Sequence, residues 1–314
     1  MATATNQPTG AAQSSDARPV LVCPDKFRGT FSALEIAAAV ELSLARHGIT
    51  SDICAMADGG EGTLEIIGNA VEAEFLTVAG CDALGRACDA PIALYDDGKR
   101  ALIESAKFIG LAQIAEQDRQ AELASSRGVG EAIATAAELG VQEIVVGIGG
   151  TASTDGGLGA LTALRESGWL ASGGEATGKT LPRITVLCDA RVEWLQAATM
   201  FSPQKGANAA ASERLRDRLT SYALELPRDP SAQLMSGCGG GLAGGLWSTA
   251  NAELKNGAAY VLDTLNFSAR MVAARAVITG EGKLDRQTLL GKGVCEVATR
   301  ARQAGVPCHA IVGS

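Results

Sequence analysis

The most constraining feature of this 314-residue sequence is a recurring short apolar run that ends in glycine or a carboxylate. Runs of this kind occupy 19–25 (PVLVCPD), 142–150 (QEIVVGIGG) and 276–282 (AVITGEG). Their unbroken apolar character is typical of strands buried on both faces. Between such runs lie helical patterns, the first over 33–48 with Ser32 and Glu35 in a capping box. The alternation predicts an α/β fold whose parallel sheets carry helices on their faces.

Composition excludes several classes of protein. With 46% hydrophobic and 20% charged residues the chain is expected to be globular, and a net charge of −8 argues against nucleic-acid binding. No apolar run approaches the ~18 residues of a membrane span. Residues 1–18 lack the apolar centre of a signal peptide and are expected to form a flexible tail. The eight cysteines form no CxxC pair, so we expect reduced thiols in a cytoplasmic protein.

The middle of the chain has a different rhythm. Residues 72–80, 89–97 and 99–105 read as shorter, mixed strands joined by turns. The return of the buried-strand pattern near the end suggests one domain built from both ends of the chain. We expect that domain over 19–76 plus 265–314, and a different α/β domain inserted over 77–264.

Three glycine motifs suggest nucleotide binding, and none is decisive alone. Residues 173–180 match the Walker A pattern, but a β-branched run follows where a helix is needed, so we interpret them as a surface turn. Residues 147–152 loosely resemble a dinucleotide loop, yet no suitable acid follows ~20 residues later, which argues against an oxidoreductase. Residues 239–244 fit GxGxxG, a common spacing in a chain with 38 glycines.

Carboxylates at four strand ends are more informative together. They are Asp58 with Glu61, Asp155 after a Gly/Ser/Thr loop, Asp189, and Glu281 with Asp285. Ligands of open parallel sheets bind beyond the carboxyl ends of the strands. Phosphoryl transfer needs backbone amides, carboxylates and lysine or arginine in one place, and all of these occur here.

Six segments in a fixed order resemble the bacterial class I glycerate kinases: 24–33 (PDKFRGTFSA), 57–63 (ADGGEGT), 125–131 (SSRGVGE), 147–157 (GIGGTASTDGG), 202–207 (SPQKGA) and 278–288 (ITGEGKLDRQT). The resemblance runs from about residue 19 to the end. It implies ATP-dependent, Mg²⁺-assisted phosphorylation of D-glycerate, usually on the 2-hydroxyl. It also implies a Rossmann- or flavodoxin-like parallel-sheet domain with a second α/β domain inserted. A homodimer is left open.

Candidate roles follow from residue type, from position in these segments and from the resemblance. Asp58 is expected to act as general base or Mg²⁺ ligand. Asp189, Glu61 and Lys26 complete the catalytic candidates, and Asp155 and Asp285 are further metal candidates. Helix capping or solvation is the alternative for each. The substrate-binding candidates are Arg28, Ser126 and Arg127. The nucleotide- and phosphate-binding candidates are Gly149, Gly150, Thr151, Ser153, Asp155, Lys205, Glu281, Lys283 and Lys292.

The sequence departs from the family pattern in three places. After Asp189 it reads 190–194 (ARVEW), where the family has an Asn-Pro-Leu stretch. The segment between Gly157 and Cys188 is shorter, and relatives continue beyond 311–314 (IVGS). The first domain is therefore expected to be shorter at its carboxyl end. These departures favour, as an alternative, a catalytically impaired relative that acts as a ligand-binding or regulatory protein.

Overall fold

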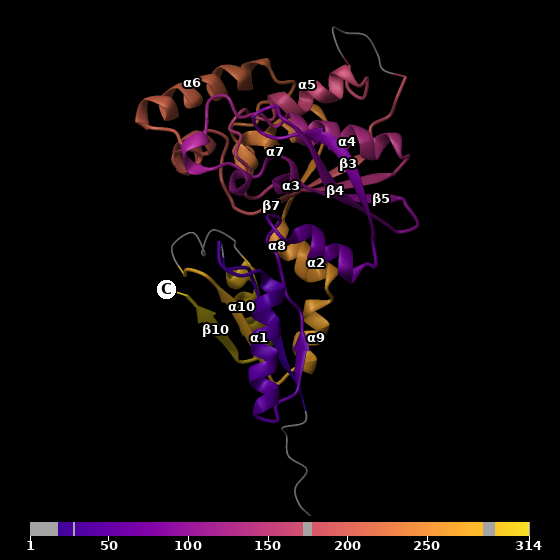
Figure 1. The fold of residues 1–314 in the computed structure, drawn as a ribbon, viewed down its shortest axis with the longest axis vertical. Helices are drawn as coiled ribbons and strands as arrows, with labels where there is room; N and C mark the ends of the chain where they lie inside the picture. Colours follow the sequence, from indigo (N-terminus) through magenta and orange to yellow (C-terminus); the bar gives the residue numbers. More distant parts are fainter. Residues whose placement is uncertain (1–17, 28, 172–177, 285–292, 314) are drawn as a thin grey trace, which may run out of the picture.

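The computed structural model describes residues 18–27, 29–171, 178–284 and 293–313. One sheet joins the two ends of the chain, in the lower half of Figure 1. It contains four parallel strands in the order β10-β9-β1-β2, namely β1 (Val20–Pro24), β2 (Ser51–Ile53), β9 (Ala276–Glu281) and β10 (Cys308–Val312). Every residue of β1 is buried, which explains its unbroken apolar sequence.

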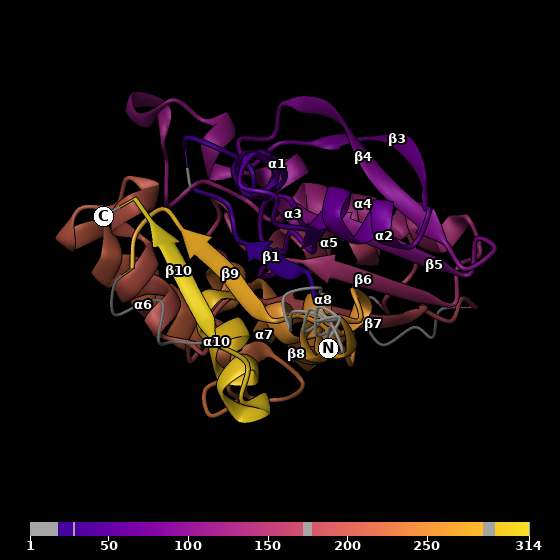
Figure 2. The same cartoon turned by 90° about the horizontal axis from the view of Figure 1, so that it is seen from below.

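Helices cover both faces of this sheet. Successive residues of β1 point to opposite faces, so each face presents apolar side chains that a helix can cover. Val20 and Val22 pack towards α1 (Ala33–Arg46), whereas Leu21 and Cys23 pack towards α9 (Phe267–Ala273) and α10 (Gly293–Ala304). Figure 2 shows β10, β9 and β1 side by side, with α1 and α10 on opposite sides. The predicted capping box at the start of α1 is confirmed.

The second sheet has six strands in sequence order and lies in the upper half of Figure 1. Its strands are β3 (Glu74–Cys81), β4 (Ala87–Tyr95), β5 (Arg100–Glu104), β6 (Glu143–Gly147), β7 (Arg183–Cys188) and β8 (Glu253–Asn256). β3, β4 and β5 pair antiparallel, and β5 to β8 pair parallel. The shorter, mixed strands expected in the middle of the chain are confirmed.

One face of the second sheet carries α4 (Arg127–Glu138), α5 (Leu158–Glu166) and α7 (Leu242–Thr249). The short α3 (Ser105–Ile109) and the longer α6 (Ala209–Glu225) also pack on this side. The opposite face carries α2 (Thr63–Ala70) and α8 (Gly257–Thr264), which lie between the two sheets in Figure 1.

A common hydrophobic core connects the two sheets. It contains Val22 of β1, Leu64 of α2, Val145 of β6, Leu187 of β7 and Val261 of α8, all almost completely buried. Burying such a side chain stabilises the fold by about 1.5–3 kcal/mol. The structure confirms the predicted α/β class, with one parallel sheet from both chain ends and a second α/β unit between them. The exact domain boundaries stay a prediction, because α2 and α8 belong to the core that the two sheets share.

Two further expectations concern single segments. The strand predicted after the Walker A match is confirmed as β7, and Lys179 pairs with Glu138 and lies over the ring of Trp169. Residues 173–177 of that match lie outside the described residues. Within the described segments, none of the helices combines the length and the apolar composition that crossing a bilayer requires.

Candidate active site

A cavity of about 320 Å³ opens where strand ends of the two sheets meet. The ends of β1, β6 and β7 supply Lys26, the loop after Gly147, and Asp189. Eight of the residues predicted from the sequence line this cavity: Lys26, Asp58, Glu61, Gly149, Gly150, Thr151, Asp189 and Lys205. Side chains and loops far apart in the chain therefore converge as expected for a ligand site beyond parallel strands.

A close backbone contact between Gly60 and Gly149 lies beside two carboxylates that line this cavity. A Cβ on Gly149 would lie 2.7 Å from the Cα of Gly60 and 3.0 Å from Oδ2 of Asp189. A Cβ on Gly60 would lie 3.1 Å from Oδ1 of Asp58. The approach requires glycine at position 149. Asp58, from the loop of Gly60, and Asp189, from the loop after β7, lie beside this backbone contact.

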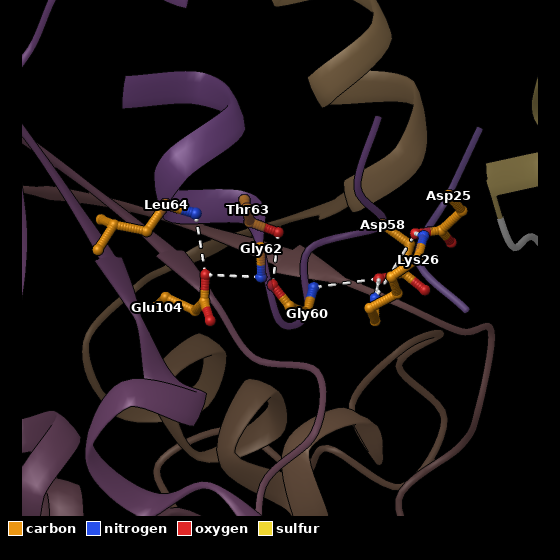
Figure 3. Close-up of polar contacts among 8 residues, drawn as sticks. All are labelled: Asp25, Lys26, Asp58, Gly60, Gly62, Thr63, Leu64 and Glu104. Atoms are coloured by element: carbon orange, nitrogen blue, oxygen red, sulfur yellow. Dashed lines mark hydrogen bonds and ion pairs between the residues drawn. The ribbon is translucent and has the colours of Figure 1, made fainter. Parts of the chain in front are cut away.

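Lys26 lies beside two carboxylates. Its Nζ is 3.1 Å from Oδ1 of Asp58 and 3.7 Å from Oδ1 of Asp25 (Figure 3). The pKa of Asp25 is raised to about 6, chiefly by burial, with the charge of Lys26 lowering it and that of Asp58 raising it. A buried carboxylate with a pKa near neutrality is a general-base candidate. Sequence reasoning missed Asp25, although it ends the first predicted strand in the same way as the chosen acids.

Glu104 is a second residue that sequence reasoning missed. It ends β5 and is fully buried, and its Oε2 accepts hydrogen bonds from the N–H groups of Gly62 (3.1 Å) and Leu64 (2.9 Å). Figure 3 shows these bonds next to the bond from Thr63 Oγ1 to the carbonyl of Gly60. The carboxylate therefore binds the first amides of α2 and holds the loop that carries Asp58. Burial raises the pKa of Glu104 to about 7.

Lys205 brings a buried cation to the cavity. It lies in a 3₁₀ turn at Pro203–Lys205, and its Nζ donates to the carbonyl of Ser153 at 2.5 Å. Burial lowers the pKa of Lys205 to about 8, while the charges of Asp155 and Asp189 act in the opposite direction. A buried ammonium needs compensating negative charge, and phosphate oxygens would supply it.

Three predicted residues form a separate cluster at the starts of α4 and α5. Oδ2 of Asp155 accepts hydrogen bonds from the N–H (2.8 Å) and Oγ (2.9 Å) of Ser126 and from the N–H of Gly159 (3.1 Å). Its Oδ1 accepts from the N–H of Gly157 (3.1 Å). Arg127 pairs with Glu131 and Glu166 on the surface. None of the three lines the cavity described above, so these contacts favour structural roles.

The remaining predicted residues are dispersed. Ser153 is buried behind the cavity and contributes its carbonyl to Lys205. Glu281 ends β9 beside β1 and is near enough to raise the pKa of Asp25. Lys283 is exposed. Arg28, Asp285 and Lys292 lie outside the described residues.

The loop over 239–241 closes one side of the cavity, and sequence reasoning gave it little weight. All three glycines have positive φ, and they lead directly into α7. A Cβ on Gly240 would lie 2.0 Å from the carbonyl oxygen of Ser153, so this loop packs tightly on the loop after β6. Successive left-handed glycines of this kind expose backbone amides suited to anions.

Buried acids, two lysines and glycine-rich loops at the ends of parallel strands define the site of an α/β phosphotransferase. The sequence profile of the glycerate kinase family matches residues 20–314. The chain belongs to the glycerate kinase family.

Individual relatives agree with this placement. The chain is 34% identical to a glycerate kinase of Halalkalibacterium halodurans and 32% identical to the glycerate 2-kinase of Escherichia coli. Each alignment covers 94% of this chain and 85% of the relative. A crystal structure assigned to glycerate kinase 2 of Salmonella typhimurium is similar with a TM-score of 0.75 and 32% identity, covering 94% of this chain and 87% of that one.

Proposed function

We propose that this chain transfers the γ-phosphoryl group of ATP to the 2-hydroxyl of D-glycerate with the help of Mg²⁺. The observation that carries the proposal is the convergence of Asp58, Asp189, Lys26 and Lys205 on one cavity in a member of the glycerate kinase family. The 2-hydroxyl position is suggested by the Escherichia coli relative, which is named glycerate 2-kinase.

The carboxylate oxygens beside the contact of Gly60 with Gly149 are suitable ligands for Mg²⁺. Asp58 and Asp189 offer hard carboxylate oxygens beside this backbone contact. Mg²⁺ is commonly held by one or two carboxylates together with substrate phosphates. No cluster of three metal-binding side chains occurs among the described residues, so in this proposal the phosphates complete the coordination. Bound there, Mg²⁺ would supply charge neutralisation for the transferring group.

The chain's own residues have distinct tasks in this proposal. The backbone amides that bind phosphate oxygens are those of four residues lining the cavity, Gly150, Thr151, Gly239 and Gly240. Lys205 and Lys26 lie where negative charge develops on the transferring phosphoryl group. The 2-hydroxyl gives its proton to a carboxylate, for which Asp58 is the first candidate and Asp25 the second. The hydroxyl oxygen forms the new P–O bond as the bond to ADP breaks.

The altered segment after Asp189 does not support an impaired relative. Trp194 is fully buried and its Nε1 donates to the carbonyl of Leu219 at 2.9 Å, while Ala190 lines the cavity. Val192 and Trp194 therefore pack in the core, while Arg191 and Glu193 are exposed. Cytoplasmic location and a homodimer remain proposals.

A coupled assay of ADP formation over a panel of small hydroxy-acids tests the function. We expect D-glycerate to be the preferred acceptor, with the product's phosphate on C2 by NMR. Binding of glycerate without ADP release would instead favour the ligand-binding alternative. A phosphate on C3 would retain the kinase and reject the 2-hydroxyl assignment.

A further inference from the structure

A second cavity, of about 440 Å³, adjoins the first and shares Lys26, Gly29 and Glu61 with it. Both cavities are lined by charged and apolar side chains, but they differ in which groups they hold. Asp58, Asp189 and Lys205 line only the first, beside the apolar side chains of Leu111, Ile148 and Phe201. The second is bounded by the large apolar side chains of Phe27, Phe31, Leu34, Met56 and Ile66, with Glu65 and Lys107 on one side.

The apolar walls do not suit the acceptor of the proposed reaction. Glycerate has three carbons bearing a carboxylate and two hydroxyls, so it offers almost no apolar surface to bury. The phosphate donor is the one reactant with an aromatic ring. Pockets for such ligands are lined mainly by apolar and aromatic side chains with a few placed polar groups, as this cavity is.

We propose that the second cavity binds the nucleoside half of the phosphate donor, with the base against Phe31 and Leu34 and the ribose hydroxyls on Glu65. This inference rests on the proposed function. The phosphates then extend into the first cavity beside Lys26 and Gly29, which line both cavities, and reach Asp58 and Asp189.

The aromatic wall is held in place before any ligand binds. Phe27 and Phe31 exchange backbone hydrogen bonds of 2.8 and 3.0 Å, and Ser32 immediately begins α1 through its capping box with Glu35. Phe31 and Leu34 are nevertheless 52% and 45% exposed. Apolar side chains that remain exposed at the edge of a cavity suit stacking on a planar base.

Glu65 supplies the polar part of this cavity. Its Oε1 accepts from Nζ of Lys107 at 2.6 Å. Its Oε2 is buried and has no hydrogen-bond partner among the described residues. A buried acceptor without a donor is costly. The Glu65 side chain as a whole is 41% exposed, so the carboxylate can turn towards the cavity, where ribose hydroxyls are donors that carboxylates commonly bind in nucleotide sites.

Phe31→Ala tests the proposal, with Leu42→Ala as matched control because Leu42 is also exposed on α1 and does not line the cavity. Loss of base stacking should raise the KM for ATP about ten-fold or more. The KM for glycerate should stay unchanged, and Phe31→Trp should restore the KM for ATP. Inhibition by inorganic tripolyphosphate, which has no nucleoside, should be the same in wild type and Phe31→Ala. Glu65→Gln should also raise the KM for ATP.

The outcomes separate this inference from the function on which it rests. An active wild type whose Phe31→Ala variant changes the KM for glycerate, or changes neither KM, overturns the nucleoside site and leaves the kinase intact. An inactive wild type refutes the proposed function, and calorimetry with Mg·ADP then reads the site directly. If the wild type is inactive, equal ADP affinity of wild type and Phe31→Ala, or no ADP binding at all, overturns the nucleoside site.

Discussion

Two loops of this protein share the sequence Asp-Gly-Gly, but the two aspartates have different neighbours. The loop after β2 carries Asp58, and the loop after β6 carries Asp155. Both acids are at least nine-tenths buried. Asp58 lines the cavity beside Lys26, whereas Asp155 accepts four hydrogen bonds from the starts of α4 and α5.

The difference shows that burial and glycine context do not separate a reactive acid from a structural one. The useful criterion is where the hydrogen-bond donors come from. Amide donors at a helix start stabilise a carboxylate as a cap, and a carboxylate of this kind contributes to folding. A lysine and an open cavity beside a carboxylate indicate ligand chemistry instead. Four substitutions test this contrast.

Asp58→Asn should have the largest effect. The amide keeps the side-chain shape and can still accept from the N–H of Gly60, but it cannot take the hydroxyl proton. We expect kcat to fall about 10³-fold, as for loss of a general base, with little change in melting temperature. The control is Asp82→Asn, a buried acid that caps a remote turn. Full turnover of Asp58→Asn would remove Asp58 from the chemistry.

Asp155→Ala should act on stability. The N–H groups of Ser126, Gly157 and Gly159 lose their acceptor, and buried donors left unpaired cost about 1–3 kcal/mol each before relaxation. We expect the free energy of unfolding in urea to fall by about 4 kcal/mol. The KM values of the folded fraction should stay near those of wild type. A large loss of kcat at unchanged stability would restore Asp155 as a metal candidate.

Glu104→Gln should change the pH dependence of stability. The folded-state pKa of Glu104 is raised from 4.5 to about 7, so its favourable contribution is complete below the unfolded pKa and is lost as pH rises through 7. Relative to Glu104→Gln, wild type should lose on the order of 2–3 kcal/mol of unfolding free energy between pH 4.5 and 8. Parallel urea-stability curves for the two proteins would contradict this reasoning.

Arg127→Ala should have the smallest effect. Its partners Glu131 and Glu166 are surface residues, and exposed ion pairs contribute about 0.2–1 kcal/mol. We expect a slight loss of stability, reduced further by salt, and an unchanged KM for glycerate. A ten-fold rise in that KM would instead support the substrate-binding role predicted from the sequence.

The sequence predicted the strands and the convergence of their ends well, since both depend on local pattern and on the rules of parallel sheets. The ends of β1, β6 and β7 lie at the cavity as expected. Neither α8 nor β8 was predicted, because both lie in stretches where strong periodicity is missing and tertiary packing decides the structure.

The candidate site was harder to predict at the level of single residues. Asp155 and Ser126 lie in two different segments that resemble the family, but their hydrogen bonds to each other are seen only in the structure. Asp25 and Glu104 were missed although each ends a predicted strand, because their importance depends on burial and on partners distant in sequence. Every carboxylate at the end of a predicted strand should therefore be treated as a candidate site residue until its hydrogen-bond partners are known.

The contact of Gly60 with Gly149 has a consequence for how this enzyme can vary. The backbones of the two loops touch there with no side chain between them, and Asp58 and Asp189 lie beside the contact. The Cβ of an alanine at position 149 would lie 2.7 Å from the Cα of Gly60 and 3.0 Å from Oδ2 of Asp189. It would push against the loop that carries Asp58 and against Asp189 itself, even with every reacting group retained. Selection on the chemistry should therefore constrain Gly149, a residue that has no functional group of its own.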